Sequence, residues 1–182
     1  MLPIGLSLEN LKSAVADAVG DFKKYDLELL ETEAHEQAIS HRIAVYLEQS
    51  FGIGTKVNLN VDCEYNKHLG GDKITIIEPQ YYLKHCQRCW CNACYKLERL
   101  AEIEEKEFRP DIVVHSRGND DNNVVAIEVK KSKVCPFDLA KLRALTLPKG
   151  AKIDYGYELG VFLHFQNNEP KYIWFLSGDI AE

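Results

Sequence analysis

The amino-acid sequence predicts an α/β fold in which helices flank a central mixed sheet. Three observations favour it: helical periodicity near the N-terminus, strict alternation near residue 60, and apolar runs of strand length after residue 110. The chain has 182 residues, of which 46% are hydrophobic and 27% are charged, so it fits one domain with a sizeable core. This composition excludes disorder and collagen-like structure.

Two helices are expected before the first strand. From residue 7 to about 25, Ser7 is placed to cap a helix whose apolar residues recur at spacings of three and four. From Asp26 to about Gln49, a stripe of isoleucine and leucine at residues 39, 43 and 47 predicts a second helix. Glycines at positions 52 and 54 end it.

The remaining expected elements alternate between strands and helices. From Val57 to Asn66, apolar and polar residues alternate strictly, which predicts a strand with one buried face. The elements expected after it are a short strand at 73–77, a charged helix at 95–107, strands at 111–115 and 124–130 joined by a loop at 118–123, a helix at 137–145, and strands at 156–165 and 172–176.

The charge of the chain is uneven. The formal net charge of −6 argues against a surface that is basic throughout, but seven basic and two acidic residues lie between Glu128 and Lys152. No apolar run approaches the roughly 18 residues that span a bilayer, so no membrane partner is expected. Since the first residues also lack the pattern of a signal peptide, a cytoplasmic location with reduced thiols is expected.

Three ionisable residues are expected to meet on adjacent strands. Asp111 opens one strand, and Glu128 and Lys130 lie two apart on the next, so both point from the same face. Buried charge survives only if it is paired, solvated or bound to a metal. Paired carboxylates suit Mg²⁺, which polarises a phosphoryl oxygen and lowers the pKa of a bound water, while the lysine orients that water. The structural alternative is that Glu128 and Lys130 form a solvated ion pair at a sheet edge and that Pro110-Asp111 is a turn. The apolar neighbours of Glu128 disfavour this alternative.

These residues resemble the signature of the PD-(D/E)XK nuclease superfamily. Pro110-Asp111 and Glu128-Val129-Lys130 match the proline-aspartate on one strand and the acid-x-lysine on the next. His35 to Leu47 is similar to the first core helix of a prokaryotic branch, which begins with a metal-binding glutamate. Three further segments resemble the first strand, the next helix and the next strand of that branch: residues 61–66, 138–142 and 155–163.

The resemblance implies a restriction-endonuclease-like sandwich, with residues 1–182 as a single nuclease-like domain and 67–107 as an inserted Cys-rich subdomain. It implies a Mg²⁺-dependent phosphodiesterase, and we expect a nuclease that uses Mg²⁺ or Mn²⁺ and acts on DNA rather than RNA. Asp111, Glu128, Glu36 and the Val129 carbonyl would bind the metal, and Lys130 would position the attacking water.

Substrate contacts are expected beside this site. Basic residues there are placed to contact phosphates, which determines affinity and not sequence preference: Lys131, Lys133, Lys141 and Arg143. Asn66 ends the first strand close to the expected metal, where it would contact substrate or hold Glu36. A homodimer or a larger protein complex is a further expectation.

Four cysteines lie within nine residues: Cys86, Cys89, Cys91 and Cys94. They form two C-x-x-C units, and thiolates select zinc or an iron–sulfur cluster over Mg²⁺. Zinc sites normally separate such pairs by a dozen residues or more. With one intervening residue, the second pair has little chain with which to reach the same ion, so a ligand from His85, Cys63 or a second protomer would be needed. Structural Zn²⁺, an iron–sulfur cluster and free or redox-active thiols all stay open.

Two other functions compete with the nuclease. One is a catalytically silent nuclease-fold module that binds nucleic acid or a protein partner, with a zinc-stabilised insertion; the modest basicity of the chain favours it. The other is a zinc- or thiol-based sensor that uses the cysteine segment. The presence of all three signature residues favours the enzyme.

Overall fold

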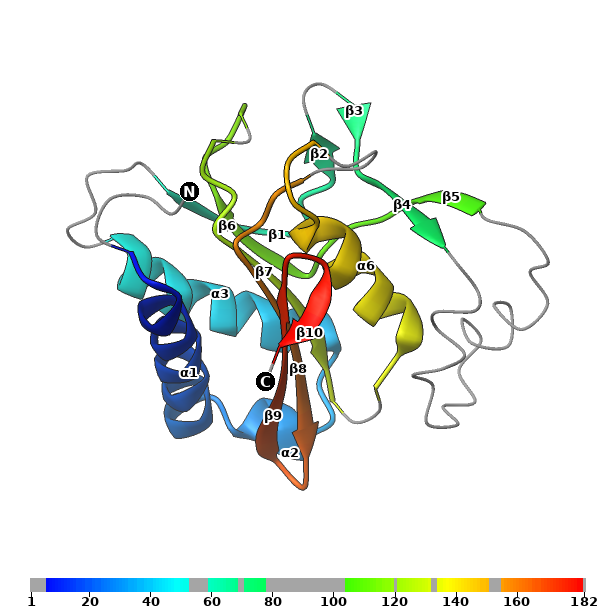
Figure 1. Ribbon diagram of the computed structural model, residues 1–182. Coiled ribbons are helices and arrows are strands. Elements are labelled where there is room, and N and C mark those ends of the chain that lie inside the picture. Colours follow the sequence, from blue (N-terminus) through cyan, green and yellow to red (C-terminus); the bar gives the residue numbers. More distant parts are fainter. Residues whose placement is uncertain are drawn as a thin grey trace.

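The computed structural model describes residues 6–52, 59–68, 71–77, 104–119, 121–131, 134–150 and 155–181. A six-stranded mixed sheet with the order β1-β6-β7-β8-β9-β10 forms its centre, with α1 and α3 on one side and α6 on the other (Figure 1). The elements that build these layers are α1 (Leu8–Tyr25), α2 (Glu28–Glu31), α3 (Glu36–Gly52), β1 (Asn60–Cys63), β6 (Ile112–His115), β7 (Val125–Lys130), α6 (Pro136–Thr146), β8 (Leu159–Gln166), β9 (Glu169–Leu176) and β10 (Asp179–Ala181). The expected mixed sheet flanked by helices is confirmed.

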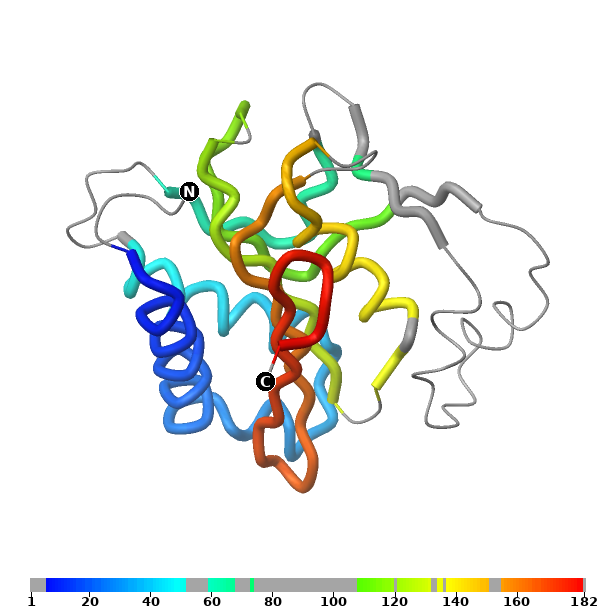
Figure 2. Tube along the Cα trace, viewed as in Figure 1, coloured from blue at the N-terminus to red at the C-terminus, as the bar shows by residue number. Residues whose placement is uncertain are grey.

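The sheet is antiparallel except where β7 and β8 run parallel, with Val125 opposite Leu159 and Lys130 opposite His164. Parallel neighbours need a crossover connection, and α6 supplies it. Figure 2 shows the chain passing from β7 through α6 and returning to β8. This crossover places α6 directly over the strand that carries Glu128 and Lys130.

Helix α1 begins where the sequence predicts. The Ser7 hydroxyl accepts a hydrogen bond from the backbone N–H of Asn10 at 3.1 Å, and the Asn10 side chain accepts one from the Ser7 N–H at 3.2 Å. This reciprocal capping satisfies two N–H groups that the first turn leaves without helical partners. The buried face of the helix consists of Leu11, Val15, Ala18, Val19 and Phe22.

The single helix expected from Asp26 to Gln49 is wrong, because the structure has two helices there. Helix α2 ends at Glu31, and Glu33 adopts a left-handed φ of 54° that stops helical hydrogen bonding. Helix α3 then starts at Glu36 and buries the expected stripe, with Ile39 and Ile43 both 0% exposed. The break puts Glu36 in the first turn of α3, where its side chain reaches the end of β7.

The second apolar layer lies between the sheet and α6. Leucines 139, 142 and 145 of α6 pack with Val113, Ala126 and Phe162 of the sheet. Strand β7 is buried and third in a sheet of six, so the alternative of an exposed edge pair at Glu128 and Lys130 is wrong. The helix expected at 137–145 is confirmed within α6.

Other strand boundaries move by a few residues. The described part of the strand expected at 57–66 ends at Cys63, since Glu64 has a φ of 51°. Strand β8 begins at Leu159 because the Tyr157 N–H is bonded to the Leu145 carbonyl and Gly156 is left-handed. Strand β10 was not expected, as three residues are too short for a periodic pattern.

The region expected as an insertion contains two short ribbons among the described residues. Strand β2 (Lys67–His68) pairs with β3 (Gly71–Asp72), and β4 (Ile74–Ile77) pairs with β5 (Glu104–Glu107). The strand expected at 73–77 is confirmed, whereas the helix expected at 95–107 is wrong at its last four residues. These residues pair with the isoleucine-rich β4, and such pairing overrides weak local propensity. The four clustered cysteines lie outside the described residues.

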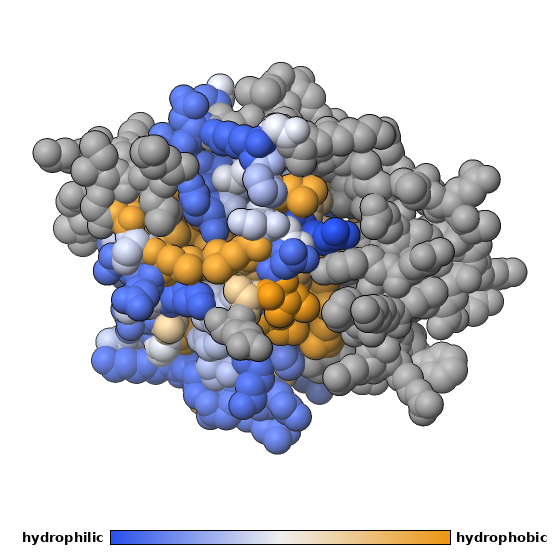
Figure 3. All heavy atoms as spheres, in the orientation of Figure 1, coloured by the Kyte–Doolittle hydropathy of each residue, from blue (hydrophilic) through white to orange (hydrophobic). Residues whose placement is uncertain are grey.

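No described helix is both long enough and apolar enough to cross a bilayer. Hydrophilic residues cover the end of the molecule at the β8–β9 turn, at the bottom of the view in Figure 3. Asn167 and Asn168 form this turn, and both are exposed with left-handed φ values of 53° and 63°.

Candidate active site

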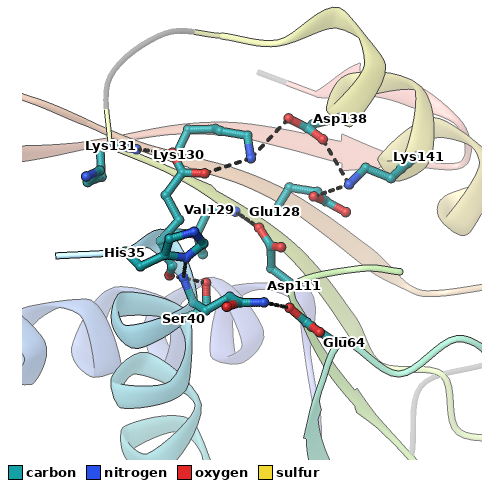
Figure 4. A network of polar contacts seen from close by, with 12 residues as sticks. His35, Ser40, Glu64, Asp111, Glu128, Val129, Lys130, Lys131, Asp138 and Lys141 are labelled. Atoms are coloured by element: carbon teal, nitrogen blue, oxygen red, sulfur yellow. Dashed lines mark hydrogen bonds and ion pairs between the residues drawn. The ribbon is translucent and has the colours of Figure 1, made fainter. Parts of the chain in front are cut away.

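Six charged side chains gather around β7 and the first turns of α3 and α6, and we call them the polar cluster: Glu36, Asp111, Glu128, Lys130, Asp138 and Lys141. They come from the first turn of α3, the residue before β6, alternate positions of β7, and the first two turns of α6. Figure 4 shows five of these residues, labelled, pointing toward one another. The predicted convergence of Asp111, Glu128 and Lys130 therefore agrees with the structure.

Asp111 is tied to β7 through the backbone. Its Oδ2 accepts a hydrogen bond from the Val129 N–H at 2.7 Å. Val129 lies between Glu128 and Lys130 in the sequence, so this bond holds the carboxylate beside both of them. The side chain is largely enclosed, and burial raises the pKa of the Asp111 carboxyl against the lowering effect of this bond. The Asp111 carboxylate therefore lies firmly beside the strand that holds the acid-x-lysine pattern.

Lys130 joins the first turn of α3 to the first turn of α6. Its Nζ lies 3.1 Å from Glu36 Oε2 and 3.5 Å from Asp138 Oδ2. The backbone N–H of Lys131 donates to the other Glu36 oxygen at 3.2 Å. Burial lowers the pKa of Lys130, but the carboxylates of Asp138, Asp111 and Glu36 outweigh it and raise the pKa, so the ammonium stays charged.

Glu128 is the most enclosed acid of the cluster. Its side chain is 0% exposed, and its Oε2 lies 2.5 Å from Lys141 Nζ. The same ammonium lies 2.9 Å from Asp138 Oδ1. The second Glu128 oxygen, Oε1, is buried and has no hydrogen-bond donor in the described parts of the chain. One Glu128 carboxylate oxygen is thus buried at the centre of the sheet without a hydrogen bond to offset its lost contact with water, and we call it the uncompensated oxygen.

The cluster has more acids than bases. Four carboxyl groups face two ammonium groups, which leaves two negative charges without a partner when all six ionise. Burial raises the pKa of Glu128 well above its usual range, Asp111 and Asp138 raise it further, and Lys141 opposes them. The pKa of Lys141 is raised because Glu128 and Asp138 together outweigh the effect of its burial. An added divalent cation would neutralise this excess.

A cavity of about 240 Å³ opens beside Asp111. Its lining combines residues of α3 with those around the end of β1: Gln37, Ser40, Cys63, Glu64 and Asp111. The Gln37 side-chain amide donates a short hydrogen bond to Glu64 Oε1, which closes the polar wall of the cavity. Burial, followed by the charges of Asp111, Asp62 and Glu64, raises the pKa of the Cys63 thiol to about 11, so it is no ready nucleophile. The cavity therefore gives a small polar group access to the Asp111 carboxylate.

A second cavity, of about 260 Å³, lies at the other end of α6 and contains none of the polar cluster. Its lining includes Asn123, Thr146 and Lys149. We place the chemistry at the cluster and not at this second cavity, because among the described residues buried carboxylates are paired with a buried ammonium group only at the cluster.

The donor set fits a hard divalent cation. Carboxylate oxygens are the ligands that Mg²⁺ prefers, and the Asp111 carboxylate is close enough to Glu128 for its charge to raise the pKa of Glu128. Within the described residues, however, no group of three or more His, Cys, Asp or Glu side chains is already arranged around one point. Lys130 and Lys141 instead fill the spaces between the carboxylates.

The other predicted residues occupy different positions. The Lys131 ammonium donates to the Glu33 carbonyl at 3.0 Å, at the helix break, and the Asn66 carbonyl accepts from the Lys73 N–H at 2.6 Å. Lys133 and the cysteines at 86, 89, 91 and 94 lie outside the described residues. Lys141, expected beside phosphates, is 7% exposed and held by carboxylates.

Asp138 is the cluster residue that sequence reasoning missed. It is 4% exposed and contacts both lysines. Its signal in the sequence is weak: an acid three residues before Lys141, in the first turn of a helix, is common on exposed helices because it favours the helix dipole. Only the packing of α6 against β7 turns this ordinary pair inward.

Comparison of the chain with protein-family models, with curated proteins and with solved structures finds no match in any of the three.

Proposed function

We propose that the protein is a Mg²⁺-dependent nuclease with a restriction-endonuclease-like fold, which hydrolyses phosphodiester bonds, in DNA rather than RNA. The observation that carries this proposal is Glu128: a fully buried acid with one uncompensated oxygen, beside Asp111 and two positions from Lys130. Burying a charged carboxylate in the middle of a sheet costs several kcal/mol, and removing the partner of a buried ion pair costs about 3–5 kcal/mol. A buried acid that is kept at such a cost is expected to have a function.

In this proposal each cluster residue has a separate role. Asp111, Glu128 and Glu36 would hold the metal, which supplies polarisation of a phosphoryl oxygen and acidification of a water. The Lys130 ammonium, on a side chain that is 25% exposed, would donate a hydrogen bond to the attacking water and offset charge that develops on the phosphate. Asp138, at 3.5 Å, would hold the ammonium in position.

Substrate would approach from the cavity beside Asp111, where a phosphate has access to the carboxylates. Lys131 and Lys133 lie within three positions of Lys130 in the sequence and would contact flanking phosphates, and Asn66 would lie near the scissile strand. Because such contacts are electrostatic, binding would weaken with added salt and depend little on base sequence.

Cleavage assays test the proposal. We expect plasmid, linear duplex or single-stranded DNA to be cut with Mg²⁺ or Mn²⁺ and to remain intact with EDTA, and RNA to be a poorer substrate. Glu128→Gln and Lys130→Ala should each reduce the rate by at least about 100-fold, because each removes a group that acts on the reacting atoms. The exposed Lys171→Ala is the matched control, as it removes one surface charge far along the sequence from the cluster.

Activity that persists in both cluster variants at the control rate would contradict the proposal, as would cleavage that EDTA leaves unchanged. The Lys141–Glu128 ion pair favours one competing function, because a lysine at a metal-binding acid also fits a silent module that only binds nucleic acid or protein. That module predicts no cleavage under any ion and equal nucleic-acid binding by wild type and Lys130→Ala.

A further inference from the structure

We propose that Lys141 is a tethered counter-ion, which occupies the cation position at Glu128 in the metal-free protein and withdraws to Asp138 alone when a divalent ion binds. The inference rests on the proposed metal-dependent function. It concerns a residue that the mechanism above leaves unused.

The geometry sets Lys141 apart from Lys130. The Lys141 ammonium is shared between Glu128 at 2.5 Å and Asp138 at 2.9 Å, whereas Lys130 contacts Glu36 and Asp138. The Lys141 side chain is 9% exposed and that of Lys130 is 25% exposed. One lysine therefore neutralises the innermost acid, while the other faces the open side of the cluster.

The attachment of the two carboxylates supports a transfer between them. Asp138 and Lys141 both belong to α6, three residues apart, so this contact persists if the helix or its side chains shift. Glu128 belongs to β7 and meets Lys141 only through tertiary packing. The Lys141–Glu128 contact is thus the one that can open while Lys141 keeps a carboxylate partner.

Charge explains why the contact would open. Without a cation, a fully buried Glu128 would be uncompensated, which is strongly destabilising, so Lys141 stabilises the metal-free fold. A divalent ion at Glu128 Oε1 would bring two positive charges close to the ammonium, and their repulsion in a poorly solvated site is large. Metal affinity is then set by competition between the ion and Lys141 for the same acid.

The test measures Mn²⁺ binding in the full chain without nucleic acid. Free Mn²⁺ is followed by electron paramagnetic resonance in wild type, Lys141→Gln and the exposed control Lys171→Gln, which changes charge equally. Mn²⁺ prefers carboxylate oxygens, so the thiols elsewhere in the chain are poor ligands for it. We expect Lys141→Gln to bind Mn²⁺ about tenfold more tightly than wild type, while its metal-free form unfolds at lower urea concentration. Lys171→Gln should change neither.

The two opposite changes separate a counter-ion from a merely structural lysine, whose loss would weaken both stability and metal binding. Equal or weaker Mn²⁺ binding by Lys141→Gln, with normal binding by wild type, overturns the inference and leaves the proposed function standing. Absence of Mn²⁺ binding in both proteins overturns the proposed function together with the inference.

A measurement on wild type keeps the inference testable if Lys141→Gln does not fold. The buried Lys141 ammonium should give a slowly exchanging signal in nitrogen-detected nuclear magnetic resonance, and titration with Mg²⁺ should shift it. An unchanged Lys141 signal at saturating Mg²⁺ overturns the inference.

Discussion

At the residue scale, the sequence around Glu128 predicts its strand and its face but not its ion-pair partner. Its spacing of two from Lys130 places both on one face of a strand, and the apolar neighbours predict a central strand. Both expectations agree with the structure. The ion pair with Lys141 was not predictable, because it depends on how a helix packs over that strand.

A second charged group lies on β1 and β6, away from the polar cluster. His115 Nε2 is 3.0 Å from Asp62 Oδ2, and Arg117 donates to both Asp62 oxygens. The hydrogen bonds from Arg117 lower the pKa of Asp62. Burial lowers the pKa of His115 below 6.5, although Asp62 acts in the opposite direction. His115 is thus more readily protonated in the unfolded chain.

This difference predicts a pH dependence of stability. As pH falls below about 6.5, the unfolded chain takes up a proton at residue 115 that the folded chain does not, so the free energy of unfolding decreases, by at most about 1.4 kcal/mol per pH unit. The contribution from Asp62 is lost only at lower pH, near and below its usual value of 3.8. Urea unfolding at pH 7.5, 6.5 and 5.5 measures the effect.

His115→Gln should unfold with a smaller loss of stability between pH 7.5 and 5.5 than wild type. The exposed His41→Gln is the control and should follow wild type. Identical pH profiles for wild type and His115→Gln would show that the histidine does not titrate differently in the two states.

At the element scale, the break between α2 and α3 decides where Glu36 lies. Residues 32–35 contain neither glycine nor proline to mark a break, so the sequence predicts one helix. The hydrogen bond from the Ala34 N–H to the Leu29 carbonyl and the left-handed Glu33 end α2 instead. Helix ends depend on such local capping, which apolar spacing does not report.

The close approach of α6 to β8 depends on Gly160. A Cβ at this position would lie 2.9 Å from Phe175 Cβ and 2.9 Å from Thr146 Cγ2. Gly160→Ala should therefore destabilise the protein by about 1–3 kcal/mol, since an extra methyl group in a filled layer forces neighbours apart. Urea unfolding of the variant against wild type measures this change.

Gly20→Ala is a control of opposite sign. Gly20 lies on an exposed part of α1, and a Cβ there meets nothing within 4 Å, so the change should stabilise by about 0.5–1 kcal/mol. A Gly160→Ala protein as stable as wild type would mean that α6 can move away from β8 at no cost.

At the scale of the whole molecule, the crossover from β7 through α6 to β8 assembles the polar cluster. It places Asp138 and Lys141 over β7, although Lys141 follows the end of that strand by more than ten positions in the chain. The same crossover covers one face of β7, while the layer that contains α1 and α3 covers the other face. Charged side chains of β7 and of α6, which lie apart in the sequence, are thereby placed within hydrogen-bond distance of one another.

The cysteine segment adds a prediction for the full chain. If the cysteine segment binds zinc, purified protein should contain about one equivalent of zinc per chain, measured by plasma mass spectrometry, and should lose it on Cys89→Ser, because that change would remove one of four thiolate ligands. Thiol titration offers the opposite outcome: six freely reactive cysteines in the native protein would rule out the zinc site.

By itself, the sequence determined the α/β class, the buried central strand and the meeting of Asp111 with the acid-x-lysine pattern, because side-chain periodicity within one strand is local. Tertiary structure alone decided that Glu104–Glu107 is a strand, that Glu36 begins its own helix, and that Asp138 and Lys141 turn inward. These features depend on pairing and packing between segments distant in the chain, and the energies of such contacts exceed the small local propensities that a sequence displays.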